Sequence, residues 1–110
     1  KMMESFVSDA EQGTHLDAGW PNTCYGVSKM GLIALTRIMA RDESAIMVNS
    51  ADPGFCATDQ NNNQGYISAA QGAVTPALLA YAAFGGGDDA DQFVSGRHFY
   101  EGREMSWTYE

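Results

Sequence analysis

Tyr25 and Lys29 are the two side chains of this sequence whose types and spacing best suit acid–base chemistry. Four residues apart, they share one face if the segment is helical, with Cβ atoms about 5–6 Å apart. A phenol has an ordinary pKa of ~10, which is too high for efficient proton exchange near neutral pH. An ammonium at ~4 Å favours the phenolate by up to ~4 kcal/mol at an effective dielectric constant of ~20, or about three pKa units. We therefore expect Lys29 to lower the pKa of Tyr25 and the pair to act as an acid–base unit.

These side chains lie in a segment that the sequence predicts to be a helix, from residue 23 to residue 42. Asn22 and Thr23 are both suitable N-cap residues, and the apolar residues that follow recur at helical spacing. They cover most of the circumference of the helix: Val27, Met30, Leu32, Ile33, Leu35, Ile38 and Met39. A helix that is apolar on so many sides is expected to be buried on more than one of them.

The rest of the chain is expected to combine helices with buried parallel strands. Ser68 and Gln71 form a capping box, and Pro76 is expected to loosen the helix that this box opens. The expected elements are a helix at 1–12 that stops at Gly13, a strand at 45–50 that Pro53-Gly54 ends, a polar turn region at 59–66, a helix from 69 to about 84, an acidic loop at 85–91, a strand at 93–100 and a polar tail that contains Trp107. This order is that of half an α/β sheet, so the predicted fold class is α/β.

Composition restricts the classes of function. The 110 residues suffice for one small domain, and 45% hydrophobic with 18% charged residues is an ordinary globular balance. The net charge of −8 argues against a nucleic-acid partner, since phosphate binding needs clustered Lys and Arg. No apolar run approaches the ~20 residues that span a bilayer, so a membrane-spanning segment is not expected. The first residues also lack the apolar region of a secretory signal.

The cysteines and histidines do not indicate a disulfide framework or a metal site. Because Cys24 and Cys56 are the two cysteines of the chain, a reducing, intracellular compartment is expected, either the cytoplasm or the interior of an organelle. His15 has no second His or Cys at the spacing of a metal site, so no metal is predicted.

The loop from Asp52 to Asp59 is the second place where chemistry is expected. It follows the predicted strand 45–50, and ligands of open α/β sheets bind beyond the carboxyl ends of the strands. A plain turn between two elements is the alternative interpretation.

Tyr25-Gly-Val-Ser-Lys29 is a weak motif alone, but others accompany it in a fixed order. They are Trp20-Pro21, Thr36-Arg37-Ile38-x-Ala40-Arg41, Val48-Asn49-Ser50-Ala51-Asp52-Pro53-Gly54, Thr58-Asp59 and Gln92-Phe93-Val94-Ser95. This ordered set resembles the C-terminal half of the short-chain dehydrogenase/reductase family, and most closely its monomeric carbonyl reductases. The resemblance covers nearly the whole chain.

The resemblance implies that residues 1–110 form the C-terminal part of one Rossmann-like domain with a doubly wound parallel sheet. It also implies reduction of a carbonyl group, in a ketone, an aldehyde or a quinone, by NADPH, with NADH as the alternative. Tyr25 would be the general acid that protonates the carbonyl oxygen. Lys29 would bind the nicotinamide ribose and lower the pKa of Tyr25, and both residues would contact the cofactor.

The same resemblance assigns roles in the loop after the predicted strand. Pro53-Gly54 and Thr58 match the loop that holds the nicotinamide, and the backbone at Cys56 is expected to meet its carboxamide. Phe55 follows the Pro-Gly pair and is expected to face the substrate. Trp20, just before the tyrosine helix, is expected to line the substrate as well.

Parts of the family pattern do not match. Gly85 to Gly87 follow a predicted helix and precede acids, which is the wrong context for a glycine-rich phosphate turn, and Ser5 and Ser8 do not match the catalytic serine. Asp52 stands where this branch commonly has Cys. Three interpretations stay open: part of a complete reductase, a catalytically inactive remnant that serves as an accessory subunit of an assembly whose other subunits cover its exposed sheet edge, and a free-standing small domain. Whether the chain is an enzyme depends on which applies.

Overall fold

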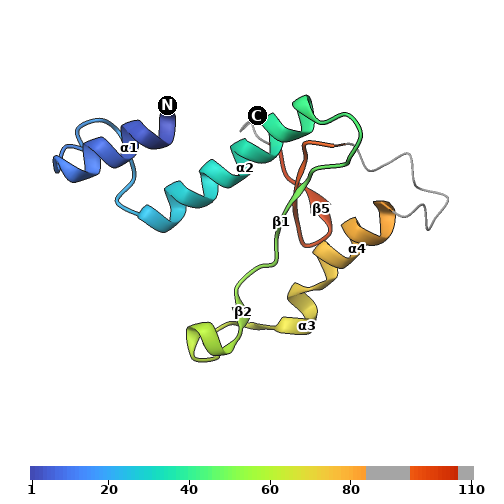
Figure 1. Cartoon of the computed structure of the whole chain (residues 1–110). Helices are drawn as coiled ribbons and strands as arrows, with labels where there is room; N and C mark the ends of the chain where they lie inside the picture. Colours follow the sequence, from blue (N-terminus) through green and yellow to red (C-terminus); the bar gives the residue numbers. More distant parts are fainter. Residues whose placement is uncertain (84–94, 107–110) are drawn as a thin grey trace. The chain divides into compact units, whose positions relative to one another are not determined.

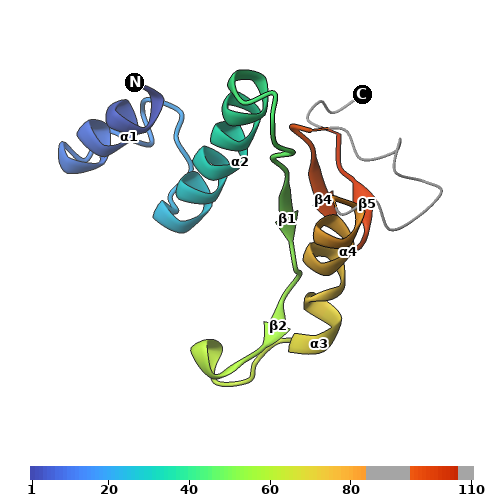
Figure 2. The same cartoon turned by 45° about the vertical axis from the view of Figure 1, so that its right-hand side comes forward.

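The computed structural model describes residues 1–83 and 95–106 and divides into two compact units, the N-terminal unit (Lys1–Leu35) and the C-terminal unit (Thr36–Glu110). Figures 1 and 2 show the elements of each unit, and one long helix, α2, contributes to both. The predicted acidic loop, the start of the predicted strand 93–100 and Trp107 lie outside the described residues. The predicted fold class is confirmed at its coarsest level, because the chain combines α-helices with short β-strands.

Helix α1, Met2–Glu11, confirms the predicted first helix and its stop at Gly13. Gly13 has a φ of 71°, and the N–H groups of Gly13 and Thr14 donate to the carbonyls of Ala10 and Asp9. This is the Schellman pattern, which satisfies carbonyls in the last turn of a helix. The chain then leaves α1 in a fixed direction.

An aromatic contact holds the following loop against α1. Phe6 on α1 is buried, and its ring centroid lies 5.4 Å from that of Trp20 in an edge-to-face arrangement. The Trp20 Nε1–H donates to Asp9 Oδ2 at 2.9 Å, which satisfies the polar end of the indole. Trp20 therefore packs on the helix that precedes it.

Helix α2, Cys24–Asp42, confirms the predicted long helix. Thr23 is the residue that caps it, because Thr23 Oγ1 accepts a hydrogen bond from the Gly26 N–H at 3.1 Å. Val27 is only 1% exposed, but apolar residues along the helix are 42–54% exposed: Met30, Leu32, Leu35, Ile38 and Met39. The expectation of burial on more than one side is therefore wrong for these side chains, since the apolar breadth of the helix exceeds what the described chain covers.

The predicted strand 45–50 is misplaced. The observed strand β1 is Ser50–Asp52, and it runs parallel to β4, His98–Tyr100. Ile46 and Met47, within the predicted strand, are exposed, and β4 begins opposite Ser50, the first residue of β1. The predicted last strand is confirmed in its C-terminal part, and the parallel pairing of the two strands is as expected.

A hairpin follows β4 where the sequence predicts only a polar tail. Strand β5, Arg103–Glu104, pairs antiparallel with β4, so the three-stranded sheet is mixed, with the order β1-β4-β5. Glu101 and Gly102 have φ values of 49° and 73°, as in a type I′ turn. The Gly102 N–H donates at 2.9 Å to Oγ1 of the buried Thr75, which ties the hairpin to helix α4, Val74–Ala83.

The capping box and the proline act as predicted. The Ser68 hydroxyl accepts from the Gln71 N–H at 3.2 Å at the start of α3, Ala69–Gly72. The helix then breaks at Ala73 before α4 begins. Pro76 explains the break, because it has no N–H for the carbonyl four residues earlier. None of the helices in the described part of the chain has the length and apolarity needed to cross a membrane.

A second, two-stranded parallel sheet joins β2, Cys56–Ala57, to β3, Ile67–Ser68. Between them lies a short 3-10 helix, η1, Asp59–Asn61, within the predicted polar turn region. The sequence does not predict these strands, because two residues are too few to show an alternating pattern.

Candidate active site

Tyr25 and Lys29 lie in the first turns of α2, and the structure brings them together as their spacing predicts. Lys29 Nζ lies 5.4 Å from the centroid of the Tyr25 ring, a distance typical of a cation–π contact. Tyr25 is 74% exposed, so a reactant can reach its phenol. Within residues 1–83 and 95–106, no carboxylate forms a salt bridge with Lys29, which leaves its ammonium able to donate to a ligand.

Local contacts fix this pair. Thr23 sets the start of α2 through its hydrogen bond to the Gly26 N–H, and Ser28 Oγ donates to the Tyr25 carbonyl at 2.7 Å. Both contacts lie within the first helical turns. The geometry of the pair therefore depends on the start of one helix and not on distant parts of the chain.

The loop after β1 turns sharply at Gly54, at the carboxyl end of the strand. Gly54 has a φ of 79°, and its N–H donates to Asp52 Oδ1 at 2.8 Å. A Cβ at this position would lie 3.0 Å from Ile67 Cδ1, so a side chain would be both strained and crowded. The turn requires glycine.

Backbone groups of Cys56 and Thr58 are already hydrogen-bonded within this loop. The Cys56 N–H donates to the Gly54 carbonyl at 3.1 Å, and the Cys56 carbonyl accepts from Asn61 Nδ2 at 2.8 Å. The Thr58 N–H donates to Asn61 Oδ1 at 3.1 Å. Asn61, which the sequence does not single out, therefore braces the loop. A carboxamide bound at Cys56 would share or replace these hydrogen bonds.

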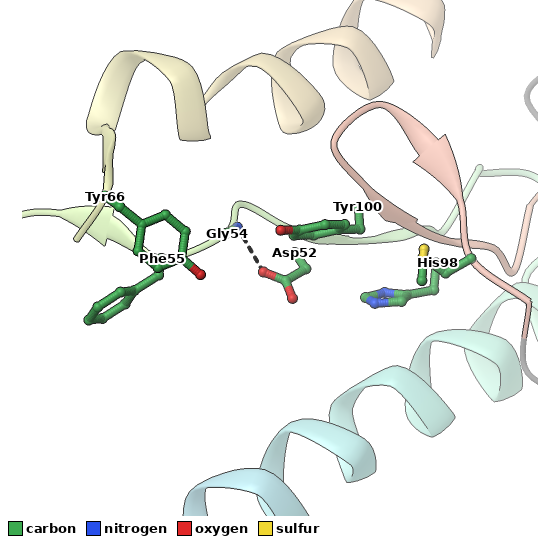
Figure 3. A pocket seen from close by; sticks show the side chains of 7 residues that line it. Asp52, Gly54, Phe55, Tyr66, His98 and Tyr100 are labelled. Atoms are coloured by element: carbon green, nitrogen blue, oxygen red, sulfur yellow. Dashed lines mark hydrogen bonds between the residues drawn. The ribbon is translucent and has the colours of Figure 1, made fainter.

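A pocket of about 430 Å³ opens beside the Gly54 turn, within the size range of small-molecule sites (Figure 3). The residues that line it are Asp52, Gly54, Phe55, Tyr66, His98, Tyr100 and Met105. Of the predicted site residues, the pocket brings together Gly54 and Phe55. Tyr25, Lys29 and Trp20 belong to the N-terminal unit.

The pocket is aromatic and acidic. The rings of Phe55 and Tyr66 lie edge to face with centroids 5.5 Å apart. The Glu101 carboxylate, next to Tyr100, is the largest cause that raises the pKa of Tyr100, followed by burial of the phenol, and Asp52 adds a smaller repulsion. His98 Nδ1 lies 3.0 Å from Ser50 Oγ, within hydrogen-bond reach. In the part of the chain that the structure describes, no three His, Cys, Asp or Glu side chains gather as metal ligands.

The sequence alone predicts only part of this pocket. It points to the loop from Asp52 onwards, but it does not identify Tyr66, His98, Tyr100 or Met105 as lining residues. For His98 and Tyr100 the missing information is the register of β1 with β4, which sets Asp52 opposite Tyr100 and Ser50 opposite His98. A parallel pairing of the two predicted strands would have placed the last residue of each at the same edge.

Comparison with known proteins gives clear relatives, although no protein-family model matches the chain. Carbonyl reductase (NADPH) 1 of Rattus norvegicus is 38% identical over 99 residues, which cover 84% of this chain and 36% of the relative. Carbonyl reductase (NADPH) 1 of Oryctolagus cuniculus is 42% identical over 85 residues, covering 72% and 31%. Carbonyl reductase (NADPH) 1 of Homo sapiens is 37% identical over 100 residues, covering 86% and 36%.

These similarities confirm the resemblance that the motifs indicate. Over most of its length the chain is related to NADPH-dependent carbonyl reductases of the short-chain dehydrogenase/reductase family. The chain spans about a third of the length of these relatives, from 31% to 36%.

Proposed function

We propose that this chain supplies the proton-transfer part of an NADPH-dependent carbonyl reductase. The observation that carries the proposal is the exposed Tyr25 ring with the Lys29 ammonium 5.4 Å from its centroid, in a chain 38% identical over 99 residues to a carbonyl reductase. The proposal also covers the fold of the domain to which the chain would belong. Residues 1–110 would be the C-terminal part of one Rossmann-like domain, in which β1 and β4 belong to a doubly wound parallel sheet.

In the proposed reaction the chain's own residues handle the proton. Bound NADPH would supply a hydride to the carbonyl carbon of a ketone, an aldehyde or a quinone. Tyr25 donates its phenolic proton to the carbonyl oxygen as negative charge develops there, which is general acid catalysis. Lys29 stabilises the phenolate that results, because its ammonium is held beside the ring. Lys29 would also hold the ribose on the nicotinamide side of the cofactor.

The loop after β1, in the C-terminal unit, is proposed to contact the cofactor and the substrate. The residues that would hold the nicotinamide are Pro53, Gly54, Cys56 and Thr58. Phe55, with 46% of its surface exposed, offers an apolar ring to the substrate. Trp20 is proposed to contact the substrate as well. It would do so through its apolar ring, because its indole N–H already donates a hydrogen bond to Asp9.

The cofactor phosphates are proposed to bind residues other than these 110, since no glycine-rich turn in a suitable context occurs among them. The names of these relatives support NADPH over NADH as the reductant. The activity is therefore tested on the protein as it occurs, with whatever further chain or subunit it contains.

The test compares Tyr25→Phe with Tyr81→Phe, a second exposed tyrosine on α4. NADPH oxidation is followed with a quinone, an aldehyde and a ketone. Tyr25→Phe should lower kcat by about 10²- to 10⁴-fold, because the general acid is lost. NADPH binding, measured by nicotinamide fluorescence, should stay close to the wild-type value. Tyr81→Phe should leave both quantities unchanged.

Lys29→Met tests both roles of the lysine at once, because it should lower kcat and weaken NADPH binding together, whereas Tyr25→Phe should lower kcat alone. Undiminished turnover in Tyr25→Phe would remove the proposed acid. A native protein that neither binds nor oxidises NADPH would support the accessory-subunit interpretation instead.

A further inference from the structure

His15 lies in the loop that joins α1 to α2, and the proposed reaction gives it no role (Figure 1). We propose that His15 is a positioning residue: through its hydrogen bond to Asn22 it holds the start of α2, and so the Tyr25 phenol, in place. The inference rests on the proposed function, since Tyr25 is the acid that would be positioned. All of the residues concerned belong to the N-terminal unit.

Two hydrogen bonds join His15 to the residues that lead into α2. Its carbonyl oxygen accepts from the Trp20 N–H at 2.9 Å, and its Nε2 lies 3.1 Å from Asn22 Oδ1. Asn22 immediately precedes Thr23, whose hydroxyl caps the helix. Tyr25 follows in the first turn of α2. Because so few residues separate Asn22 from Tyr25, a shift of the asparagine is passed on to the tyrosine.

The surroundings of the imidazole favour the form that this hydrogen bond requires. An amide oxygen only accepts, so His15 Nε2 must carry the proton that is donated to Asn22. His15 Nδ1 is buried and, within the described residues, has no hydrogen-bond partner. A proton on Nδ1 would be a buried donor without an acceptor, which is costly. The tautomer that donates to Asn22 is therefore the one that fits.

His15 is bonded to both sides of a relation that the proposed reaction needs. Trp20 is held on α1 by its ring contact and its indole hydrogen bond, and it is proposed to contact the substrate. Tyr25 is proposed to protonate the same substrate, so the ring and the phenol must keep a fixed relation. The His15 backbone is bonded to Trp20 and its side chain to Asn22. Loss of the side-chain bond alone should leave Trp20 in place and let the start of α2 shift.

A role as a metal ligand does not fit His15. Within residues 1–83 and 95–106 it belongs to no group of three His, Cys, Asp or Glu side chains that could hold a metal ion. One ring nitrogen is bonded to an amide oxygen and the other is buried. The geometry is that of a side chain that braces a loop.

The test exploits the different positions of the amide nitrogen in Gln and Asn. Counted along the side chain, the Gln nitrogen corresponds to Nε2 of histidine and the Asn nitrogen to Nδ1. His15→Gln can therefore still donate to Asn22, whereas His15→Asn cannot. NADPH oxidation with a quinone is measured on the protein as it occurs. His15→Asn should lower kcat about 10-fold, since a misplaced reacting group costs up to ~10²-fold. His15→Gln should stay within about 2-fold of wild type.

Further readouts separate positioning from a general loss of folded protein. In His15→Asn the stoichiometry of NADPH binding and the KM for the quinone should stay close to wild type while kcat falls. Asn22→Ala removes the acceptor and should lower kcat as His15→Asn does. The double variant should be no worse than either single one, because both remove the same hydrogen bond. Leu16→Ala, at a neighbouring side chain that is 59% exposed, is the control and should behave as wild type.

The nitrogen-15 NMR signals of the imidazole report on the hydrogen bond without turnover. At about pH 8.5, above the range in which histidines usually protonate, His15 should carry its proton on Nε2 and none on Nδ1. Asn22→Ala should shift the Nε2 signal and the ring signals of Tyr25. Leu16→Ala should leave both in place.

The outcomes distinguish this inference from the proposed function. Wild-type kcat in both His15→Asn and Asn22→Ala, with Tyr25→Phe still impaired, would overturn the inference and leave the proposed function standing. So would a proton on Nδ1 of His15, or a loss of NADPH-binding sites in proportion to kcat. Undiminished turnover in Tyr25→Phe would instead remove the proposed acid and, with it, the group that His15 positions. If His15→Asn fails to fold, Asn22→Ala and the imidazole signals decide the matter.

Discussion

The two units of the chain carry their chemistry in different ways. In the N-terminal unit, Tyr25 and Lys29 are neighbours because they are four residues apart on one helix, and their contact needs no other element. In the C-terminal unit, the pocket gathers residues from Asp52 to Met105, and the hydrogen-bonding pair of Ser50 and His98 is 48 residues apart in sequence. A catalytic motif can therefore be complete within one helix, whereas the pocket of the same chain forms only because distant strands pair.

The units also differ in what stabilises them. The N-terminal unit depends on a small buried core, with Phe6 and Val27 as its buried apolar side chains. Among its described residues, the C-terminal unit has Phe99 as a buried apolar side chain and adds specific hydrogen bonds, such as that of Thr75 with the hairpin. Substitutions of buried apolar residues should therefore lower stability most in the N-terminal unit. Substitutions that disturb a turn or remove a hydrogen bond should lower it most in the C-terminal unit.

Phe6→Ala should have the largest effect, a loss of about 3–5 kcal/mol of stability in the N-terminal unit. It removes the buried ring against which Trp20 packs. Amide hydrogen exchange resolved by residue would show faster exchange in α1 and at the start of α2. The control is Val7→Ala, one residue along and 52% exposed, which should change stability by less than ~0.5 kcal/mol. Equal loss of protection in both units would show that they unfold as one.

The sequence predicts the local features of the molecule well. The N-cap expected at Asn22 or Thr23, the stop at Gly13, the capping box of Ser68 and the break before Pro76 each depend on a few adjacent residues. The structure confirms these features, with Thr23 as the cap. The family resemblance is also readable, because its motifs are short and ordered.

What the sequence does not predict depends on pairing between distant segments. The strand expected at 45–50 is displaced to Ser50–Asp52, because pairing with β4 and not local propensity sets its limits. The β4–β5 hairpin turns at Glu-Gly, which lacks the usual Asn or Asp before the glycine. Tyr66 and Tyr100 join the pocket only through such pairings, so no local pattern marks them.

Gly54→Ala should be the next largest effect, about 1–3 kcal/mol, because it adds crowding to a strained backbone. Its φ is 79° and the new Cβ would lie 3.0 Å from Ile67 Cδ1. Gly19→Ala is a matched control in the N-terminal unit, with a φ of 84° and nothing within 4 Å of the added Cβ. Thermal unfolding of both variants separates strain from crowding. Equal costs would show that Ile67 moves aside and that the Gly54 turn is less tightly packed than the structure indicates.

Thr75→Val should cost about 1 kcal/mol or somewhat more, because it leaves the Gly102 N–H without its acceptor. Thr75 is 5% exposed, so water does not readily replace the hydroxyl. Thr75→Ser keeps the acceptor and is the control. Hydrogen exchange at Gly102 gives the most direct readout, since only the valine variant should accelerate it. Unchanged exchange there would mean that α4 does not hold the hairpin.

Glu101→Gln should have the smallest effect on the fold and a clear one on titration. The Glu101 carboxylate is the largest cause that raises the pKa of Tyr100 above its ordinary value of 10.0, and Asp52 is the smallest. Removal of the Glu101 charge should therefore lower this pKa more than Asp52→Asn does. Because the folded-state pKa is raised, the stability that it contributes is present below the ordinary value and is lost as the pH rises through the folded-state pKa. NMR titration of the Tyr100 ring carbon that bears the hydroxyl measures each shift. If Asp52→Asn lowered the pKa of Tyr100 more than Glu101→Gln did, this order would be reversed. The Asp52 carboxylate, and not that of Glu101, would then be the main charge acting on Tyr100.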